Sequence, residues 1–178
     1  SPNGGFYWPA FPYRSYQGMS DEVVLEIAAY LVTLPPINNE VPDHELPAWQ
    51  FSWMMSGWNI LADFMEGKAS AVGNDPQLQR GADLARNFMH CGECHTPRNA
   101  LGISDLSNEF AGQEGVVSFA LTSEGLRAYT SEDFVYFLQD GFTDNFEQVG
   151  GEMLAVINHT SQFTQEDREA LAAFLFRG

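Results

Sequence analysis

Two cysteines and a histidine lie within one short stretch of this 178-residue chain, HCGECHTPRN, and they are the residues best suited to chemistry. Cys91 and Cys94 are the only cysteines, and His95 directly follows the second one. Two thiols at this spacing can form a disulfide, act as a redox switch, bind a metal ion or hold a covalently attached group. The choice among these uses decides what the chain does.

The sequence around the motif disfavours the disulfide, the redox switch and the metal site but does not exclude them. A redox C-x-x-C motif of the thioredoxin kind belongs to a βαβ context, whereas this motif follows a helical pattern and precedes a Gly-rich segment. A structural zinc site needs four ligands, commonly from two cysteine pairs. The chain has no second pair, and its remaining nitrogen ligands are His44, His90, His95 and His159.

The fourth use is haem attachment, because C-x-x-C-H is the signature of a c-type haem. Two thioether bonds to the porphyrin vinyl groups need cysteines about one helical turn apart, and the next residue must then place an imidazole under the iron. We therefore predict one haem c, covalently bound through Cys91 and Cys94, with His95 as an iron ligand.

A second iron ligand is expected in the glycine-flanked stretch VGGEMLAVIN, where Met153 offers a thioether sulfur. This soft ligand favours ferrous iron, and Met/His ligation raises the reduction potential. An ordinary core methionine is the alternative for Met153, and His90 and His159 are rival ligands. Arg98, one of eight Lys and Arg residues, is a candidate for binding a haem propionate or is a surface arginine.

The surroundings of His95 carry two further expectations. A carbonyl in residues 109–118 is expected to accept the second ring proton of His95 and so fix the orientation of the ring. An apolar shell is expected to keep the haem dry, although each member could equally be ordinary core. The candidates are Phe88, Leu101, Phe110, Phe119, Leu121, Phe134, Phe137, Leu138, Leu154, Phe174 and Leu175.

Helices must bring these residues into place, and helical periodicity is the main signal while strand signals are weak throughout. Residues 96–128 lack periodicity and are rich in glycine, which predicts a long loop that wraps a bound group or is otherwise functional. The fold class is therefore all-α with long loops. Caps and apolar stripes predict helices over roughly residues 20–34, 49–66, 75–90, 131–140 and 164–176, and a short helical turn at 153–158.

Composition limits the partners and the location of the chain. Asp and Glu outnumber Lys and Arg by 24 to 8, so the formal net charge is −16. Such a surface repels nucleic acid and anionic lipid and favours a partner with a basic docking face. No apolar run approaches the ~18 residues of a membrane helix, and no signal-peptide pattern is present. We expect either a cytosolic chain, or a mature form or fragment without its export signal.

Residues 80–178 resemble a class I-like cytochrome c domain. The resemblance rests on HCGECHTPRNALG, TSEDFVYFLQDGFT and VGGEM…TQEDREALAAFL, which are similar to the second haem domain of bacterial multi-haem cytochromes c. Those proteins accept electrons from periplasmic dehydrogenases for alcohols, sugars, sugar acids or thiosulfate. By this resemblance alone, Thr122 and Tyr129 are further candidates for contacts with the haem propionates.

The front of the chain, SPNGGFYWPAFPYRSYQGMSDEVVLEIAAYLVTLPP, resembles the tail of the preceding haem domain in the same proteins. The resemblance implies a remnant of an upstream cytochrome c domain over residues 1–36, a linker with one helix over 37–75, and a cytochrome c domain with one covalent haem over 76–178. The implied fold is a class I-like cytochrome c domain with long haem-wrapping loops, preceded by a helical remnant of a second cytochrome c domain.

Together these expectations describe a periplasmic electron-transfer cytochrome c that relays single electrons to or from a dehydrogenase or respiratory partner. With His95 and Met153 both bound, the iron has no open coordination position, so the chain is expected to be a carrier and not an enzyme. Two alternatives stay open: a haem enzyme of the thiosulfate-oxidising or peroxidase type, and a structural docking subunit of a redox complex. A second haem domain or another subunit is expected to pack on residues 1–66.

Overall fold

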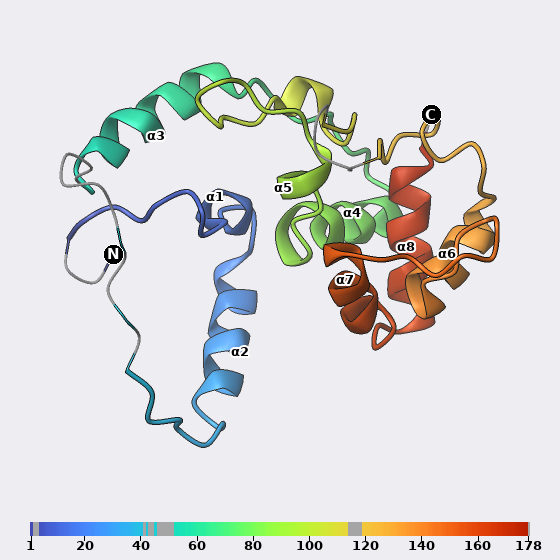
Figure 1. Ribbon diagram of the computed structural model, residues 1–178, viewed down its shortest axis with the longest axis horizontal. Coiled ribbons are helices and arrows are strands. Elements are labelled where there is room, and N and C mark those ends of the chain that lie inside the picture. Colours follow the sequence, from blue (N-terminus) through green and yellow to red (C-terminus); the bar gives the residue numbers. More distant parts are fainter. Residues whose placement is uncertain (2–3, 41, 43–44, 46–51, 114–118, 178) are drawn as a thin grey trace.

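The computed structural model describes the chain except for residues 2–3, 41, 43–44, 46–51, 114–118 and 178 (Figure 1). Its helices are α1 (Tyr13–Tyr16), α2 (Asp21–Leu31), α3 (Met54–Met65), α4 (Pro76–Asp83), α5 (Gly92–His95), α6 (Ser131–Asp140), α7 (Glu152–Thr160) and α8 (Gln165–Leu175). A π-helical turn, η1 (Leu84–Phe88), continues α4, and a 3-10 turn, η2 (Leu106–Asn108), lies in the loop after α5. Within the described residues the only β pairings are two isolated bridges. The all-α prediction is confirmed.

Most helix ends fall where local capping chemistry predicts. The side chain of Asp75 accepts from the backbone N–H groups of Gln77 and Leu78 at the start of α4. Thr130 and Asp133 form a reciprocal capping box on α6. Gly141 ends α6 in the left-handed region, at φ 78°, where a side chain would be strained.

Three helices differ from the predicted bounds. α2 ends at Leu31, although the sequence predicts a helix up to residue 34. The chain turns at Val32, before it reaches Pro35. α3 starts at Met54, and the predicted start at residue 49 lies outside the described residues. α7 is a helix of nine residues where only a short turn was expected.

The core is built on the crossing of α4 and α8, against which α6 and η1 also pack (Figure 1). At this crossing a Cβ on Gly81 would lie 2.0 Å from the carbonyl oxygen of Ala170 and 2.6 Å from Cβ of Phe174. Only glycine permits the two helices to approach this closely. α7 packs on α6 on the side of this bundle, so that the stretch containing Met153 is carried by the same core.

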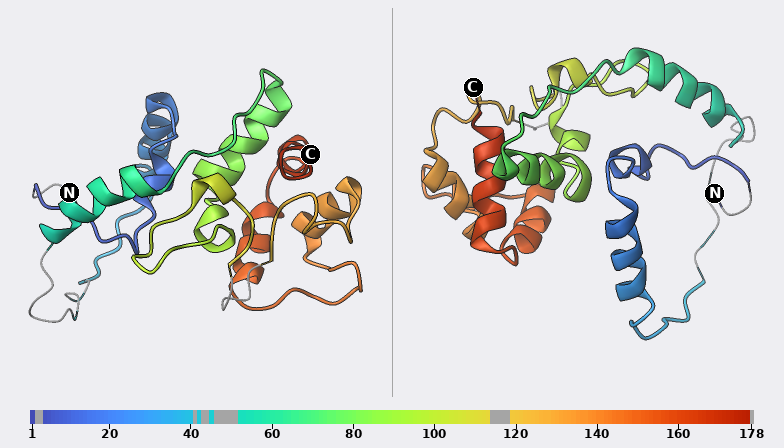
Figure 2. Two further views of the ribbon diagram at one scale, coloured as in Figure 1. Left: turned by 90° about the horizontal axis from the view of Figure 1, so that it is seen from above. Right: turned by 180° about the vertical axis from the view of Figure 1, so that it is seen from behind.

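Two of the N-terminal helices, α2 and α3, lie apart from this bundle, whereas α1 packs on η1. In Figures 1 and 2, α2 extends away from α4 and α8, and α3 runs beside the loop that follows α5. No residue of α2 is buried, and Ala62 is the only buried residue of α3. None of the described helices has both the length and the apolar character needed to cross a lipid bilayer.

Candidate functional site

The CGECH motif, separated from the end of η1 by two residues, forms a single helical turn, α5. The backbone N–H groups of His95 and Thr96 donate to the carbonyls of Cys91 and Gly92, each at 3.0 Å. Side chains three residues apart on a helix share a face, so the two thiols point to the same side of the turn. Both cysteines are free thiols, Cys91 half-buried and Cys94 exposed, and burial raises the pKa of Cys91 to about 12.

The imidazole of His95 is oriented by a backbone carbonyl. Its Nδ1 lies 2.6 Å from the carbonyl oxygen of Phe119. A carbonyl can only accept, so Nδ1 carries the proton and Nε2 keeps its lone pair for a metal ion. Burial lowers the pKa of His95, an effect that the hydrogen bond to Phe119 partly opposes, and the neutral ring is the form that binds iron.

The predicted range for this carbonyl, residues 109–118, was wrong by one position. The loop returns to the motif at Phe119, where the N–H of Leu121 also donates to the carbonyl of Phe110 at 2.7 Å. Residues 114–118 of that range lie outside the described residues. Every residue of the loop offers a carbonyl, so no sequence signal could select this one.

Met153 is the second residue of α7 and is separated by Glu152 from the two glycines of the predicted ligand stretch. Its side chain is half-buried and packs against the hydrophobic core. Gly151 precedes the helix at φ 62°, in the left-handed region, and provides no side-chain cap. The structure therefore places Met153 at the uncapped N-terminal end of a helix, and its role as iron ligand stays a prediction.

The rival ligands lie in other surroundings. The ring of His90 packs edge-on against Tyr16, with 5.8 Å between the ring centroids. His159 is exposed in the last turn of α7, and His44 lies outside the described residues. Among the residues that the structure describes, no three His, Cys, Asp or Glu side chains converge as a zinc site would require.

The predicted apolar shell divides into three groups, of which the smallest, Phe88 and Leu121, is partly buried against the core. Six members are buried among other core side chains: Phe110, Phe134, Phe137, Leu138, Phe174 and Leu175. By contrast, Phe119 is 77% exposed although its own carbonyl binds His95, and Leu101 and Leu154 are also exposed. A flat, apolar macrocycle beside His95 would cover surface of this kind, which is otherwise costly to leave in water. The free thiol pair, the oriented imidazole and the exposed Phe119 beside it fit a covalently bound haem.

The three propionate candidates each have a partner in the protein. Arg98 forms an ion pair with the carboxylate of Glu93, and its Nη1 donates to the carbonyl of Gly102 at 3.0 Å. The hydroxyl of Thr122 accepts from the N–H of Gly125 at 3.3 Å. Burial raises the pKa of Tyr129, whose phenol also takes part in a hydrogen bond with the backbone of Asp144. Their contacts with propionates stay predictions.

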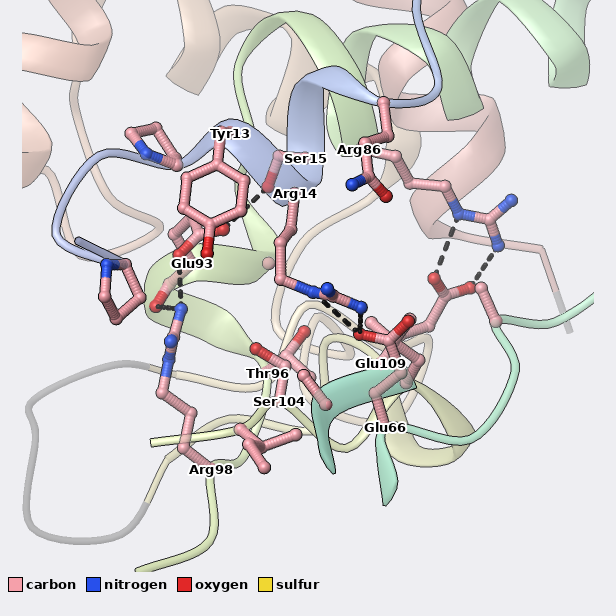
Figure 3. Close-up of a pocket in the computed structure, with 18 of the residues that line it drawn as sticks. Tyr13, Arg14, Ser15, Glu66, Arg86, Glu93, Thr96, Arg98, Ser104 and Glu109 are labelled. Carbon is pink, nitrogen blue, oxygen red and sulfur yellow. Dashed lines mark hydrogen bonds and ion pairs between the residues drawn. The ribbon is translucent and has the colours of Figure 1, made fainter. Parts of the chain in front are cut away.

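Sequence reasoning missed a polar cluster beside the motif, shown in Figure 3. Glu93, between the two cysteines, accepts from Ser15 of α1 at 2.6 Å as well as from Arg98. Arg14, the neighbour of Ser15, donates to Asp63 of α3 and to Glu66, the residue that follows α3, each at 2.7 Å. A cavity of about 210 Å³ lies between these side chains. The only sequence signal for this cluster was the acidic residue Glu93 inside the motif. Its partner Ser15 lies 78 residues away in the sequence, so the pair could not be predicted.

Comparison with known proteins gives relatives along nearly the whole chain, although no protein-family model matches it. The chain is 38% identical to a "Diheme cytochrome c-type" protein of Cereibacter sphaeroides, over 99% of this chain and 61% of the relative. It is 31% identical to the "Gluconate 2-dehydrogenase cytochrome c subunit" of Pantoea cypripedii, over 97% of this chain and 43% of that relative. It is 29% identical to the "Fructose dehydrogenase cytochrome subunit" of Gluconobacter japonicus, over 97% of this chain and 37% of that relative. The chain thus spans less than two thirds of the length of each.

Proposed function

Because the chain belongs to the cytochrome c family, we propose that it is an electron carrier with one haem c, attached through Cys91 and Cys94 and ligated by His95 and Met153. The observation that carries this proposal is the helical turn Cys91–His95 with the His95 ring held by the carbonyl of Phe119. Two thiols on one face, followed by an imidazole with a free Nε2, are what covalent attachment and axial ligation need.

In this proposal the chain orients and shields, and the bound haem supplies the one-electron couple. Phe119 keeps the His95 ring in one orientation and one tautomer, so that little rearrangement accompanies a change of oxidation state. Met153, in the C-terminal part of the chain, supplies a neutral sulfur. A neutral ligand does not stabilise the additional positive charge of ferric iron. Phe119, Leu101 and Leu154 exclude water where they cover the haem.

We further propose that the redox partner is a periplasmic dehydrogenase or another respiratory protein with a basic docking face. Support comes from the net charge of −16, which accelerates encounters with a basic surface. The names of two relatives describe them as cytochrome subunits of dehydrogenases. The donor substrates of those relatives are not carried over to this chain.

Residues 6–65 carry an apolar surface that the rest of the chain does not cover. We define it as the N-terminal apolar face; it comprises Phe6, Tyr7, Phe11, Val24, Leu25, Ile27, Tyr30, Leu31, Ile60, Leu61, Phe64 and Met65, each at least 41% exposed. Exposed apolar side chains in this number, on α2, α3 and the segment before α1, mark a site of association. A second haem-bearing cytochrome domain, or another subunit, is proposed to cover it.

The relative from Cereibacter sphaeroides supports the first of these occupants. Its name states two haems, whereas this chain has one C-x-x-C-H motif and matches 61% of that relative's length. Under this proposal, residues 1–36 complete an upstream cytochrome c domain, residues 37–75 form a linker with one helix, and residues 76–178 are the domain that holds the haem.

The carrier proposal is tested by spectroscopy and a redox titration of the purified haem-loaded chain. The expected result is one reversible one-electron couple for the chain, with the far-red ferric iron–methionine band present in the wild type and absent in Met153→Ala. A high-spin ferric spectrum with rapid binding of cyanide or peroxide in the wild type would contradict the proposal and favour the haem-enzyme alternative.

A further inference from the structure

We propose that Arg168 is a positioning residue for Met153: it holds the C-terminal end of α7 so that the methionine at the other end is presented to the iron in one place. This inference rests on the proposed function, because it takes Met153 to be the distal ligand. Nothing in the sequence pattern assigns a role to Arg168.

The guanidinium of Arg168 is buried and points at the end of α7. The residue is 8% exposed and lies in the first turn of α8. Its Nη1 donates to the carbonyls of Phe163, Thr160 and Ser161 at 2.6, 3.3 and 3.4 Å. Its Nη2 donates to Oε1 of Gln139, in α6, at 3.1 Å. One side chain therefore joins α6, α7 and α8.

The charge of Arg168 is neutralised by carbonyl dipoles and not by an acid. No carboxylate among the described residues forms an ion pair with it, and its Nε is buried without a hydrogen-bond partner. A cation in the first turn of a helix is opposed by the dipole of that helix, whereas the carbonyl end of another helix attracts it. Burying the Arg168 charge would therefore destabilise α8 by itself. The stabilising interaction is the one with the free carbonyls at the end of α7.

The two ends of α7 are held very differently. At the C-terminal end, Thr160 also donates through its hydroxyl to the carbonyl of Leu138 at 2.6 Å, and Ile157 is buried. At the N-terminal end, Gly150 and Gly151 have no neighbouring atom within 4 Å of a built Cβ, and no side chain caps the helix.

Met153 and Thr160 are seven residues apart, about 10 Å along a helix. Two glycines cannot fix the direction in which the chain enters α7, because they permit many backbone conformations. The anchored end, together with the packing of Met153 against the core, therefore sets the direction of the helix and the position of the Met153 side chain.

The test compares Arg168→Gln with the wild type as full-length, haem-loaded ferric protein. Imidazole competes with Met153 for the iron, so its apparent affinity reports how easily the methionine leaves. We expect imidazole to bind roughly tenfold more tightly in Arg168→Gln than in the wild type. This factor corresponds to the loss of about one charge-assisted hydrogen bond. Hydrogen exchange of the α7 amides is expected to accelerate together with it. Arg168→Lys, which keeps a charged donor at the carbonyls, is expected to lie between the two.

Two control variants separate positioning from a loss of charge or of overall stability. Lys68→Gln removes one exposed cation, and Gly81→Ala strains the crossing of α4 and α8 without touching the end of α7. Unchanged imidazole affinity and α7 exchange in Arg168→Gln, or the same changes in Gly81→Ala at equal loss of stability, would overturn the inference. Absence of the iron–methionine band from the wild type would instead refute the ligand set of the proposed function.

Discussion

Replacing Gly81 with alanine is expected to destabilise the fold more than the same change at Gly57 or Gly92, the other glycines in the described helices. The new Cβ would lie 2.0 Å from the carbonyl oxygen of Ala170, which is backbone and cannot rotate away. Overpacking of this kind costs about 3 kcal/mol at the upper end of the usual range. Alanine returns up to ~1 kcal/mol through its better helix propensity. The net loss is therefore about 2 kcal/mol.

The assay is denaturant and thermal unfolding of the full haem-loaded chain, followed by far-UV circular dichroism. A loss of 2 kcal/mol lowers Tm by roughly 8–16 °C for a unit of about 100 residues. Gly57→Ala in α3 is the matched control, since a Cβ there meets no atom within 4 Å. It is expected to be neutral or to stabilise by up to about 1 kcal/mol. Equal Tm values for the two variants would refute the close crossing of α4 and α8.

Three other substitutions test particular contacts. Glu109→Gln is expected to cost about 2 kcal/mol in denaturant unfolding, because the nearly buried carboxylate binds two arginines, Arg86 and Arg177; Glu124→Gln, an exposed control, should change nothing. Ser15→Ala should raise hydrogen exchange of the α1 amides about fivefold, since α1 loses its bond to the motif helix, and unchanged exchange would contradict that contact. Tyr129→Phe should shift the midpoint potential in a redox titration if its phenol binds a propionate, while an equal shift in Tyr136→Phe, whose phenol is largely exposed, would count against that role.

Local chemistry explains which parts of the fold the sequence predicts. The caps at Asp75, Thr130 and Thr164 depend on atoms within three residues, and each operates in the structure as its residue type suggests. The CGECH turn is local in the same sense. These features need no knowledge of how distant segments meet.

Tertiary contacts explain what sequence reasoning missed. The carbonyl that holds His95 belongs to Phe119, 24 residues away, and any residue could have supplied it. The bond from Ser15 to Glu93 joins residues 78 positions apart. The apolar stripe of α2 was predicted, yet its members Leu25 and Leu31 are exposed, because a helical pattern indicates a face to be covered but not which molecule covers it.

The central claim is that this chain holds haem covalently through Cys91 and Cys94. The most direct measurement is the intact mass of the chain after expression with a haem-maturation system. The account predicts the mass of the polypeptide plus one haem, which the double variant Cys91→Ala and Cys94→Ala loses. A wild-type mass equal to that of the bare polypeptide, or a double variant that retains the haem-bearing mass, would contradict it.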